Sequence, residues 1–377
     1  MLVATSVTAD ARVLRQAEAL VDAGHVVSII GKDIPAGTRP PRGTTFFTAS
    51  GGGGLPLSSA TGAGGTRASF RAARWMLLPE HRALSFRRWS TASARVAGGL
   101  IYDVVHAHDF SALPLGSRLS GQQQVPLVYD SHEMWSERRR SGRPTPVRTL
   151  WERRSEKALG SRADAVLTVG DGLAERLRSS YGWTRVSVVR NTFPLMALDP
   201  ARHRTAPTGV VYAGRLAAGR DLDTVAAASR SLSLPVSLLG PVDSFWSARF
   251  DEGFCRMLPP VEVGAVGTAL RSAGLALVTL EPGCGNHEIA LPNKLFHAVS
   301  AGVPVVASDV GELARTVRAH GLGVLYRAGD PASLVGAVEE ARRRYPELVA
   351  AVGRAAEELS WPRDRATLLR VYAGLVR

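Results

Sequence analysis

The chain has 377 residues, 45% of them hydrophobic, and a formal net charge of +13 at pH 7. This length exceeds one ordinary hydrophobic core, so we expect two domains of roughly 150–200 residues each. The sequence has no run of about 18 uncharged apolar residues, and no basic segment followed by an apolar one at its start. We therefore predict a cytoplasmic protein without a membrane span or a secretory signal.

Arginine supplies nearly all of the positive charge. Lys32, Lys157 and Lys294 are the three lysines among 46 basic residues. The resulting field attracts anions such as nucleotide diphosphates, acidic acceptors or an anionic membrane face. Since no zinc-finger spacing, RNP-like aromatic pattern or helix-turn-helix signal accompanies the charge, we expect no nucleic-acid partner. Cys255 and Cys284, the two cysteines, do not form a CxxC pair, which argues against a disulfide framework or a structural zinc site.

The start of the chain has the βαβ pattern that opens a doubly wound domain. Leu2–Val7 is predicted as a strand, Asp10–Ala23 as a helix and Val26–Ile30 as the next strand. The turn between the first strand and the helix contains Thr8 and Asp10. Polar side chains at this place either cap the helix or face an acceptor molecule, and we keep both interpretations.

The next segment has no periodicity and then becomes strongly basic. Residues 34–67 contain glycine runs and a proline pair, so we predict a mobile loop. Residues 66–98 are predicted as one or two basic helices, with Trp75 and Trp89 among the arginines. One interpretation is a solvated arginine face over buried tryptophan. The other is a platform for an anionic acceptor or for peripheral membrane contact through residues 67–95.

Two predicted strands end in histidines and carboxylates. One ends in His106 and His108, and the next ends near His132 and Glu133. Ligands of doubly wound sheets lie at the carboxyl ends of the strands, so we expect both clusters to line one cleft. The HxH pattern also suggests a metal. However, we expect alternate residues of this strand to face opposite ways, and no third ligand has convincing spacing, so we predict no metal site.

The domain boundary follows from the loss of periodicity after residue 193. Residues 138–154 are rich in arginine and contain two prolines, and a helix that ends near Leu159 follows them. Further elements are predicted at Ala165–Val169, Asp171–Tyr181 and Val186–Val189. Residues 194–207 are polar and proline-bearing. We therefore place an amino-terminal domain at 1–193, a carboxyl-terminal domain at 208–361 and an amphipathic helix at 362–377.

A second doubly wound unit begins with a strand at Gly209–Tyr212. The loop after it contains Gly214, Arg215 and Arg220, before a helix from about Asp221. Gly214 permits close backbone approach, and a fork of two guanidinium groups can hold a diphosphate. The remaining predicted elements are strands at Pro235–Leu239, Gly274–Leu280, Val303–Ala307 and Gly323–Tyr326, and a helix at Pro331–Arg344.

The stretch Leu275–Glu312 predicts a ligand site. An apolar run is followed by a polar loop, by the helix Pro292–Gly302 and by a second apolar run. Pro292 suits the first helical position and Gly302 the stop, so the free amides at the helix start form an anion site. The polar loop adds four side chains that can bind hydroxyls: Glu281, Asn286, His287 and Glu288. We predict a phosphorylated ligand rich in hydroxyl groups.

Taken together, these motifs resemble the GT-B-fold retaining glycosyltransferases of family 4 (group 1). The resemblance rests on an ordered set: DVVHAHDF, PLVYDSHEMW, VYAGRL and LPNKLFHAVSAGVPVVASDVGE. SWPRDRATLLRVY is similar to the closing helix of the family, which crosses back to the amino-terminal domain. The resemblance implies an α/β fold with two Rossmann-like domains that face a central cleft.

The resemblance also implies a reaction and its participants. The family transfers a sugar from a nucleoside-diphosphate sugar to an acceptor hydroxyl or other nucleophile, with retention, by front-face substitution without a metal or a cofactor. The donor lies mainly on the carboxyl-terminal domain and the acceptor on the amino-terminal one. The acceptor class stays open between a small molecule, a lipid-linked precursor and a polysaccharide.

Roles follow for the residues that match the family's motifs. The resemblance implies that Arg215 and Arg220 hold the diphosphate, while His108 orients the donor sugar. His132 and Glu133 are candidates for the acceptor side, and a capping role is the alternative for both. The start of the helix assists in donor binding, through Leu291, Pro292, Asn293 and Lys294.

One departure from the family concerns its paired-glutamate motif, whose two positions are Ile289 and His297 here. We expect Glu288, together with Asn286, to take the sugar-binding role, and we expect the binding of the nucleotide to depend on His297. Two alternatives stay open. One is a sugar-nucleotide epimerase or hydrolase on the same fold, and the other is a non-catalytic partner or scaffold subunit.

Overall fold

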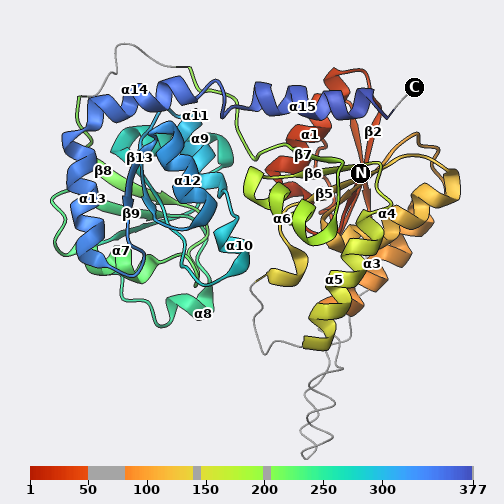
Figure 1. The fold of residues 1–377 in the computed structure, drawn as a ribbon, viewed down its shortest axis with the longest axis horizontal. Helices are drawn as coiled ribbons and strands as arrows, with labels where there is room; N and C mark the ends of the chain where they lie inside the picture. The colour runs from red at the N-terminus through yellow and green to blue at the C-terminus, as the bar shows by residue number, and fades with distance from the viewer. Residues whose placement is uncertain (50–80, 139–145, 198–204, 376–377) are drawn as a thin grey trace, which may run out of the picture. The chain divides into compact units, whose positions relative to one another are not determined.

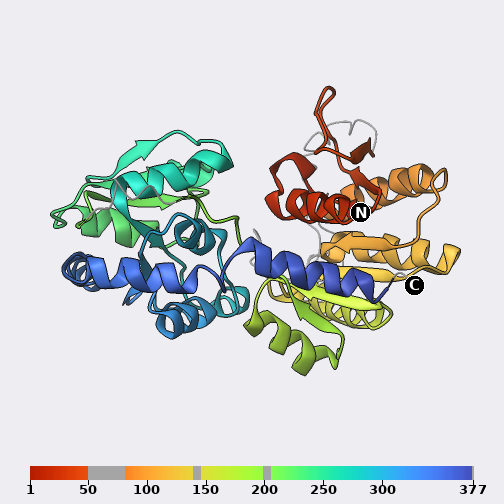
Figure 2. The same cartoon turned by 90° about the horizontal axis from the view of Figure 1, so that it is seen from above.

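The computed structural model describes residues 1–49, 81–138, 146–197 and 205–375. The chain divides into two compact units, each with its own parallel sheet. Unit 1 contains Met1–Val189 and Arg365–Arg377, and unit 2 contains Arg190–Asp364. Figures 1 and 2 show that helices cover both faces of the sheet in each unit. The prediction of two doubly wound α/β domains is confirmed.

The sheet of unit 1 has seven parallel strands in the order β3-β2-β1-β4-β5-β6-β7. Their bounds are β1 Leu2–Val3, β2 Val27–Gly31, β3 Thr44–Thr48, β4 Val105–His108, β5 Leu127–Ser131, β6 Ala165–Thr168 and β7 Val186–Val188. The order reverses at β1, whose neighbours are β2 and β4. Such a reversal opens a crevice at the carboxyl ends of the strands, where His108 ends β4.

The helices of unit 1 lie on both faces of this sheet (Figure 1). They are η1 Val7–Ala9, α1 Ala11–Asp22, α3 His81–Ala97, α4 Asp109–Gln123, η2 Trp135–Glu137, α5 Pro146–Gly160, α6 Asp171–Tyr181 and the part of α15 (Trp361–Ala373) from Arg365 onward. The Asp10 carboxylate caps α1, because it accepts hydrogen bonds from the amides of Arg12 and Val13. Thr8 does not cap this helix, since it lies in η1.

Two predictions concern residues 34–98, and the structure describes only part of each segment. The prediction of a mobile loop is wrong for β3, since the β-branched and aromatic sequence TTFFT pairs with β2 along its whole length. Residues 50–67 of that loop lie outside the described residues. The predicted basic helix is confirmed for α3, and its preceding part, 66–80, again lies outside the described range.

The sheet of unit 2 has six parallel strands in the order β10-β9-β8-β11-β12-β13. The strands are β8 Gly209–Ala213, β9 Val236–Leu239, β10 Arg256–Leu258, β11 Gly274–Val278, β12 Val305–Ser308 and β13 Gly323–Tyr326. The helices are α7 Leu222–Ser229, α8 Ser244–Ser247, α9 Val263–Ala273, α10 Gly285–Glu288, α11 Asn293–Ser300, α12 Gly311–His320, α13 Pro331–Arg343 and α14 Tyr345–Ala355. Sequence analysis did not predict the short edge strand β10.

Each face of the sheet in unit 2 has its own apolar core. Successive strand residues point to opposite faces, so Val211 and Val305 join the core on one face while Val210 and Val306 join the core on the other. All these side chains are buried. Burying one side chain of this size contributes about 1.5–3 kcal/mol, so the two cores hold the strand ends, and the loops on them, in fixed positions.

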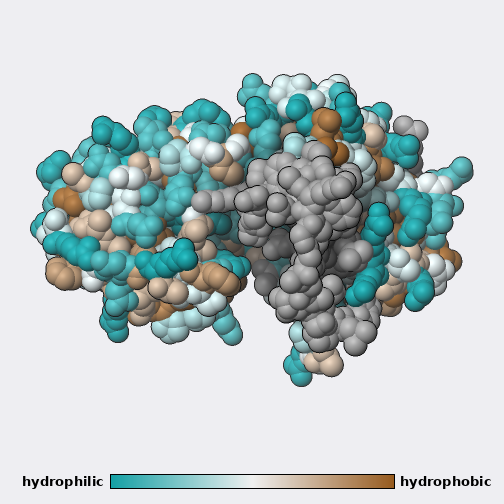
Figure 3. All heavy atoms as spheres, turned by 90° about the horizontal axis from the view of Figure 1, so that it is seen from below, coloured by the Kyte–Doolittle hydropathy of each residue, from teal (hydrophilic) through white to brown (hydrophobic). Residues whose placement is uncertain are grey.

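The coloured part of the surface in Figure 3 is mainly hydrophilic, with hydrophobic side chains scattered between. A search of the described residues for a helix long and apolar enough to cross a membrane finds none.

Candidate functional site

Glycines bring two loops of unit 2 into contact at the carboxyl edge of its sheet. Gly240 follows β9 and has a φ of 145°. A Cβ atom at this position would lie 2.1 Å from the carbonyl oxygen of Gly214, the residue that follows β8. Only glycine fits this approach, and it sets the path of the loop that contains Arg215 and Arg220.

Asp221 closes the same loop. It has a left-handed φ of 52° and is buried. The hydroxyls of Thr224 and Tyr326 each donate to its carboxylate at 2.6 Å. Burial raises the pKa of Asp221. These bonds fix the residue after Arg220, a position that sequence analysis treated only as the start of a helix.

The Arg215 guanidinium forms an ion pair with a carboxylate that an anionic ligand can displace. Nη2 of Arg215 donates to Oδ2 of Asp243 at 2.9 Å, and the Arg215 side chain is 67% exposed. An exposed ion pair of this kind contributes about 0–1 kcal/mol. Little free energy is therefore lost when a diphosphate displaces Asp243 from Arg215. Asp243 also caps α8. Arg220 is half-buried, and its carbonyl accepts a hydrogen bond from the hydroxyl of Thr279.

Lys294 faces the same loop from the start of α11. Its Nζ lies 4.8 Å from the ring centroid of Tyr212, and a Cβ added to Gly214 would lie 3.4 Å from its Cδ. Burial, and next the charge of Arg220, lower the pKa of Lys294 to about 7. Among the described residues no carboxylate pairs with this amine. The three cations Arg215, Arg220 and Lys294 thus converge on one loop, as a site for an anion.

The polar loop after β11 is tied to the loop after β8. The amide of Gly219 donates to Oε1 of Glu281 at 3.1 Å, and Nδ1 of His287 lies 2.6 Å from the Glu281 carbonyl oxygen. Glu281 therefore positions the loop. Asn286 is buried, whereas Glu288 is exposed.

The start of α11 differs by one residue from the prediction. Pro292 is the N-cap residue, with an extended ψ of 144°, and Asn293 is the first helical residue. Leu291 is buried in the core below. The free amides of the first turn therefore begin at Asn293, directly before Lys294, and a helix start of this kind favours an anion.

His297, in the last turn of α11, packs on an aromatic ring. Its ring stacks on that of Phe193, with a centroid distance of 3.8 Å and an interplanar angle of 26°. Phe193 is buried. The stack fixes the plane of the imidazole, and sequence analysis had no signal for this partner because it lies 104 positions earlier in the chain.

Unit 1 holds a second polar cluster, centred on the buried carboxylate of Asp130. Arg12 donates to both oxygens, at 2.8 and 2.7 Å, and Gln16 donates to Oδ2 at 2.9 Å. All three side chains are buried. Burial raises the pKa of Asp130, but Arg12 and then His132 oppose it and hold that pKa well below its usual range. Asp130 is therefore a charged centre that the sequence analysis missed.

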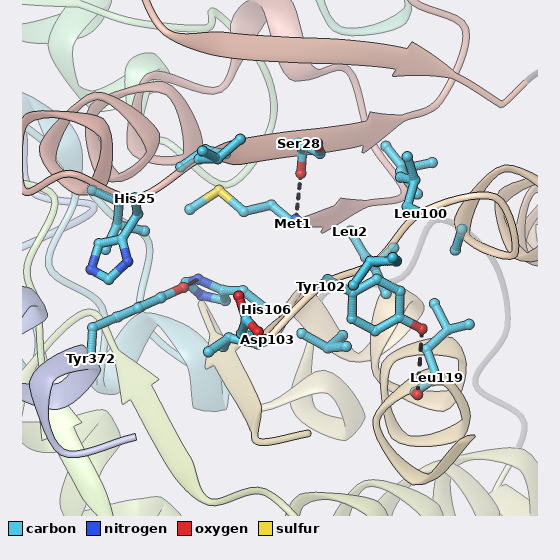
Figure 4. Close-up of a pocket in the computed structure, with 18 of the residues that line it drawn as sticks. Met1, Leu2, His25, Ser28, Leu100, Tyr102, Asp103, His106, Leu119 and Tyr372 are labelled. Atoms are coloured by element: carbon cyan, nitrogen blue, oxygen red, sulfur yellow. Dashed lines mark hydrogen bonds between the residues drawn. The ribbon is translucent and has the colours of Figure 1, made fainter. Parts of the chain in front are cut away.

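Three histidines surround Oδ2 of Asp130. His108 Nδ1 lies 3.3 Å away, His132 Nε2 3.5 Å and His106 Nε2 3.9 Å. The rings of His106 and His108 stack at 4.2 Å, so the expectation that they face opposite ways is wrong. Residues two positions apart on a strand share a face. Figure 4 shows His106 beside Tyr372, whose hydroxyl lies 2.8 Å from His106 Nδ1.

These positions also change the prediction about a metal. Ligand atoms of His106, His108 and Asp130 lie within 4.8 Å of one another, so a third ligand exists, on the neighbouring strand. However, Asp130 is already neutralised by the bidentate Arg12, and a metal ion would have to compete with that guanidinium. The arrangement fits a polar network that is balanced by the chain's own cation.

The protonation states of the three histidines differ. Burial lowers the pKa of His108 by more than Asp130 raises it, so this imidazole is neutral. Nδ1 of His108 faces Oδ2 of Asp130, whereas its Nε2 makes no hydrogen bond within the described residues. Burial also lowers the pKa of His132, but Asp109 and Asp130 outweigh it and raise the value to about 9. A neutral imidazole whose Nε2 has no partner suits a ligand hydroxyl, and an imidazolium suits an anion.

Two carboxyl groups flank His132. Asp109 begins α4 with a left-handed φ of 62°, and its Oδ2 lies 3.4 Å from His132 Nδ1. Burial raises the pKa of Glu133 to about 7. A carboxyl group that titrates near neutral pH can accept or release a proton, as a general acid or base does.

A cavity of about 390 Å³ in unit 1 borders this cluster at His106, which lines the cavity together with Tyr372. Many of its other lining residues precede or begin β1, β2 and β4, among them Met1, His25, Tyr102 and Asp103 (Figure 4). Ligands of doubly wound sheets bind at the other, carboxyl ends of the strands, so this cavity is not the predicted site.

Two family models match most of the chain. The glycosyl transferase 4-like domain matches residues 8–192, and glycosyl transferases group 1 matches residues 210–343. D-inositol 3-phosphate glycosyltransferase of Geodermatophilus obscurus is 27% identical over 72% of this chain, and the match spans 66% of that relative's length. Phosphatidyl-myo-inositol mannosyltransferase of Mycobacterium leprae is 33% identical over 31% of this chain and 31% of the relative.

Solved structures with the same fold cover the whole chain. Sucrose-phosphate synthase of Thermosynechococcus elongatus has a TM-score of 0.71 and 16% identity, over 99% of this chain and 98% of that one. HepE of Anabaena in complex with UDP has a TM-score of 0.70 and 13% identity, over 99% of both chains.

Proposed function

Because the chain belongs to the group 1 glycosyltransferases, with a glycosyltransferase 4-like amino-terminal domain, we propose that it transfers a sugar from a nucleoside-diphosphate sugar to an acceptor hydroxyl. The observation that carries the proposal is the convergence of Arg215, Arg220 and Lys294 on the loop after β8. Cations at this place stabilise the negative charge that develops on a departing diphosphate.

The donor site in unit 2 follows from these contacts. The diphosphate replaces Asp243 on the Arg215 guanidinium and lies over Gly214, where no side chain intervenes. Arg220, Lys294 and the first amides of α11 complete its neutralisation. Asn286, His287 and Glu288 bind sugar hydroxyls from the following loop. HepE structures contain UDP and UDP-glucose, so uridine nucleotides are the first donors to test.

The cluster in unit 1 provides the remaining roles. We assign His108 to a hydroxyl of the donor sugar, because its imidazole is neutral and its Nε2 has no partner. We assign His132, Glu133 and the exposed Thr8 to the acceptor side, whereas the Asp10 carboxylate caps α1. The mechanism retains configuration by front-face attack, without a metal or cofactor, so positioning provides much of the rate.

The acceptor is the least determined participant. The relatives' names specify D-inositol 3-phosphate and phosphatidyl-myo-inositol, so an inositol-type polyol, free or lipid-linked, is the first acceptor class to test. A polysaccharide is the next. Peripheral membrane contact through residues 67–95 would favour the lipid-linked form, and residues 67–80 of that segment lie outside the described residues.

A matched pair of arginine variants tests the donor site. Arg215→Ala should abolish UDP binding by calorimetry and donor hydrolysis, with an unchanged melting temperature. Arg230→Ala removes an exposed arginine of unit 2 that pairs with Asp251 at 2.7 Å, outside the loop, and should leave both intact. Equal UDP affinity of the two variants would remove Arg215 from the site.

A donor panel tests the function as a whole. UDP-, GDP- and dTDP-sugars should include at least one that binds and is slowly hydrolysed without acceptor. A protein that binds none of them would instead be a non-catalytic partner subunit. Donor turnover that never yields a glycoside with any acceptor would favour an epimerase or hydrolase. Transfer to an inositol-type acceptor, with the anomeric configuration read by NMR, would establish the proposed reaction.

A further inference from the structure

Helix α5 has its apolar side chains outside and its carboxylates inside. Val147, Leu150 and Trp151 are 50%, 47% and 60% exposed, whereas Glu152 and Glu156 are only 1% and 0% exposed. A surface helix of a soluble protein normally turns its apolar stripe to the core and its charges to water. This helix does the reverse, so its outer face needs an explanation.

The inner face explains why the helix keeps this rotation. The hydroxyls of Tyr129 and Tyr181 donate to the Glu156 carboxylate at 2.7 and 2.8 Å. Glu152 accepts from Arg148 Nε at 2.9 Å. Turning the helix to bury its apolar stripe would break the hydrogen bonds of the Glu152 and Glu156 carboxylates. Each broken bond of this kind lowers the stability of the fold. The carboxylates therefore fix which side chains face outward.

The end of the helix adds a steric constraint. A Cβ atom at Gly160 would lie 2.1 Å from the ring of Trp183. The ring packs directly on the helix backbone there, and its Nε1 donates to Ser161 Oγ at 3.1 Å. The docking of α5 on unit 1 is thus determined by contacts at the middle and at the end of the helix, and the outward stripe is a fixed feature of the surface.

The outward face combines apolar groups with positive charge. Val147, Leu150 and Trp151 occupy positions i, i+3 and i+4, which lie on one side of a helix. Arg154, one turn after Leu150, continues the same stripe, and Arg153 and Lys157 border it. All three cations are exposed, and none has a carboxylate partner among the residues that the structure describes.

We propose that the outer face of α5 docks on an anionic lipid bilayer. Valine, leucine and tryptophan enter the boundary between headgroups and acyl chains, and the cations bind lipid phosphates. A protein partner fits less well, because lysine is depleted at protein interfaces and Lys157 borders the stripe. On a bilayer its long side chain reaches back to the phosphates.

The surroundings of α5 support an anionic partner. Helix α4 packs against both α5 and α3, and α3 contributes the exposed Arg87, Arg88 and Arg95 (Figure 1). Both acids of α5 itself are buried, so every charge that α5 shows to solvent is positive. The stripe on α5 itself lies outside residues 67–95, and the proposal does not depend on the chemistry proposed for the donor site.

Vesicle sedimentation tests the proposal with the full chain. The protein should sediment with vesicles of equimolar phosphatidylcholine and phosphatidylglycerol, and not with phosphatidylcholine alone. The double variant Leu150→Glu, Trp151→Glu should lose at least tenfold in partition coefficient. Each of Arg154→Gln and Lys157→Gln should lose about fivefold at low salt, since each removes one cation near an anionic surface. Circular dichroism and thermal unfolding verify that the variants are folded.

A control and two contrary outcomes complete the test. Phe245→Glu changes a side chain that is 92% exposed in unit 2 and should bind vesicles like the unaltered protein. Equal vesicle binding by the α5 double variant would overturn the proposal, because another surface would then be responsible. No vesicle binding, together with an oligomer in solution that the double variant dissociates, would also overturn it and assign the face to a second copy of the chain.

Discussion

His132 provides a quantitative test of the electrostatics in unit 1. Its ring lies between the carboxylates of Asp109 and Asp130, at 3.4 and 3.5 Å, and it is 21% exposed. Burial alone would lower its pKa, but the two carboxylates raise the value from 6.5 to about 9. We therefore predict that the folded protein keeps this imidazole protonated at pH 7, whereas the unfolded chain does not.

The sign of the effect on stability follows from linkage. A histidine whose folded-state pKa is raised stabilises the fold fully below its unfolded pKa of 6.5, and this contribution is lost as the pH rises through about 9. At about 1.4 kcal/mol per pKa unit, the shift corresponds to roughly 3 kcal/mol. The variant His132→Gln should thus be less stable by about this amount at pH 6, and the deficit should disappear toward pH 10.

Denaturant unfolding at pH 6, 8 and 10 measures the deficit. Five of the seven tryptophans precede residue 190, so tryptophan fluorescence mainly follows unit 1. The control His320→Gln removes a histidine of unit 2 that is 23% exposed and lies 4.0 Å from Glu358, and should not change the unit 1 transition. A deficit of His132→Gln that is equal at pH 6 and pH 10 would refute the electrostatic explanation.

Three further predictions concern unit 2. Gly240→Ala places a Cβ atom 2.1 Å from the Gly214 carbonyl oxygen, so it should cost about 1–3 kcal/mol in thermal unfolding and weaken UDP binding. UDP affinity should rise up to about tenfold per pH unit between pH 9 and pH 8, as Lys294 protonates, and calorimetry with Lys294→Met should show no such rise. His297→Glu should tighten UDP binding by offering a carboxylate to the ribose. If His297→Glu and His297→Ala weaken UDP binding equally, position 297 does not contact the ribose.

The elements that sequence analysis predicted best have continuous apolar runs or clear amphipathic spacing. The strand Gly323–Tyr326 and the helix Asp171–Tyr181 have the predicted bounds, because both patterns are strong local signals. The edge strands β3 and β10 were missed, although β13, also an edge strand, was predicted. The sequence of β3, TTFFT, has no continuous apolar run, and β10 has three residues, so the local pattern of both strands is weak.

The functional residues divide in the same way. Gly214, Arg215 and Lys294 could be found because a glycine-rich turn and a helix start are local features with a known preference for phosphate. Asp130 could not be found as the centre of its cluster. Its partner Arg12 lies 118 positions away, and only the strand order brings β5 beside β4 and opposite α1. Partners of this kind are set by topology, which residue spacing does not reveal.

The Asp130 cluster of unit 1 holds its charged groups tightly, whereas the cations of unit 2 are held weakly. The Asp130 carboxylate is buried and receives three donated hydrogen bonds from Arg12 and Gln16, so removing one partner costs about 3–5 kcal/mol in stability. In unit 2, Arg215 forms an exposed ion pair with Asp243, and the contact seen for Lys294 within the described ranges is with the ring of Tyr212. A site that must bind and release an anion needs cations whose own partners are easily replaced. Substitutions around Asp130 should therefore lower stability first, whereas substitutions of Arg215 or Lys294 should lower donor affinity and leave stability nearly unchanged.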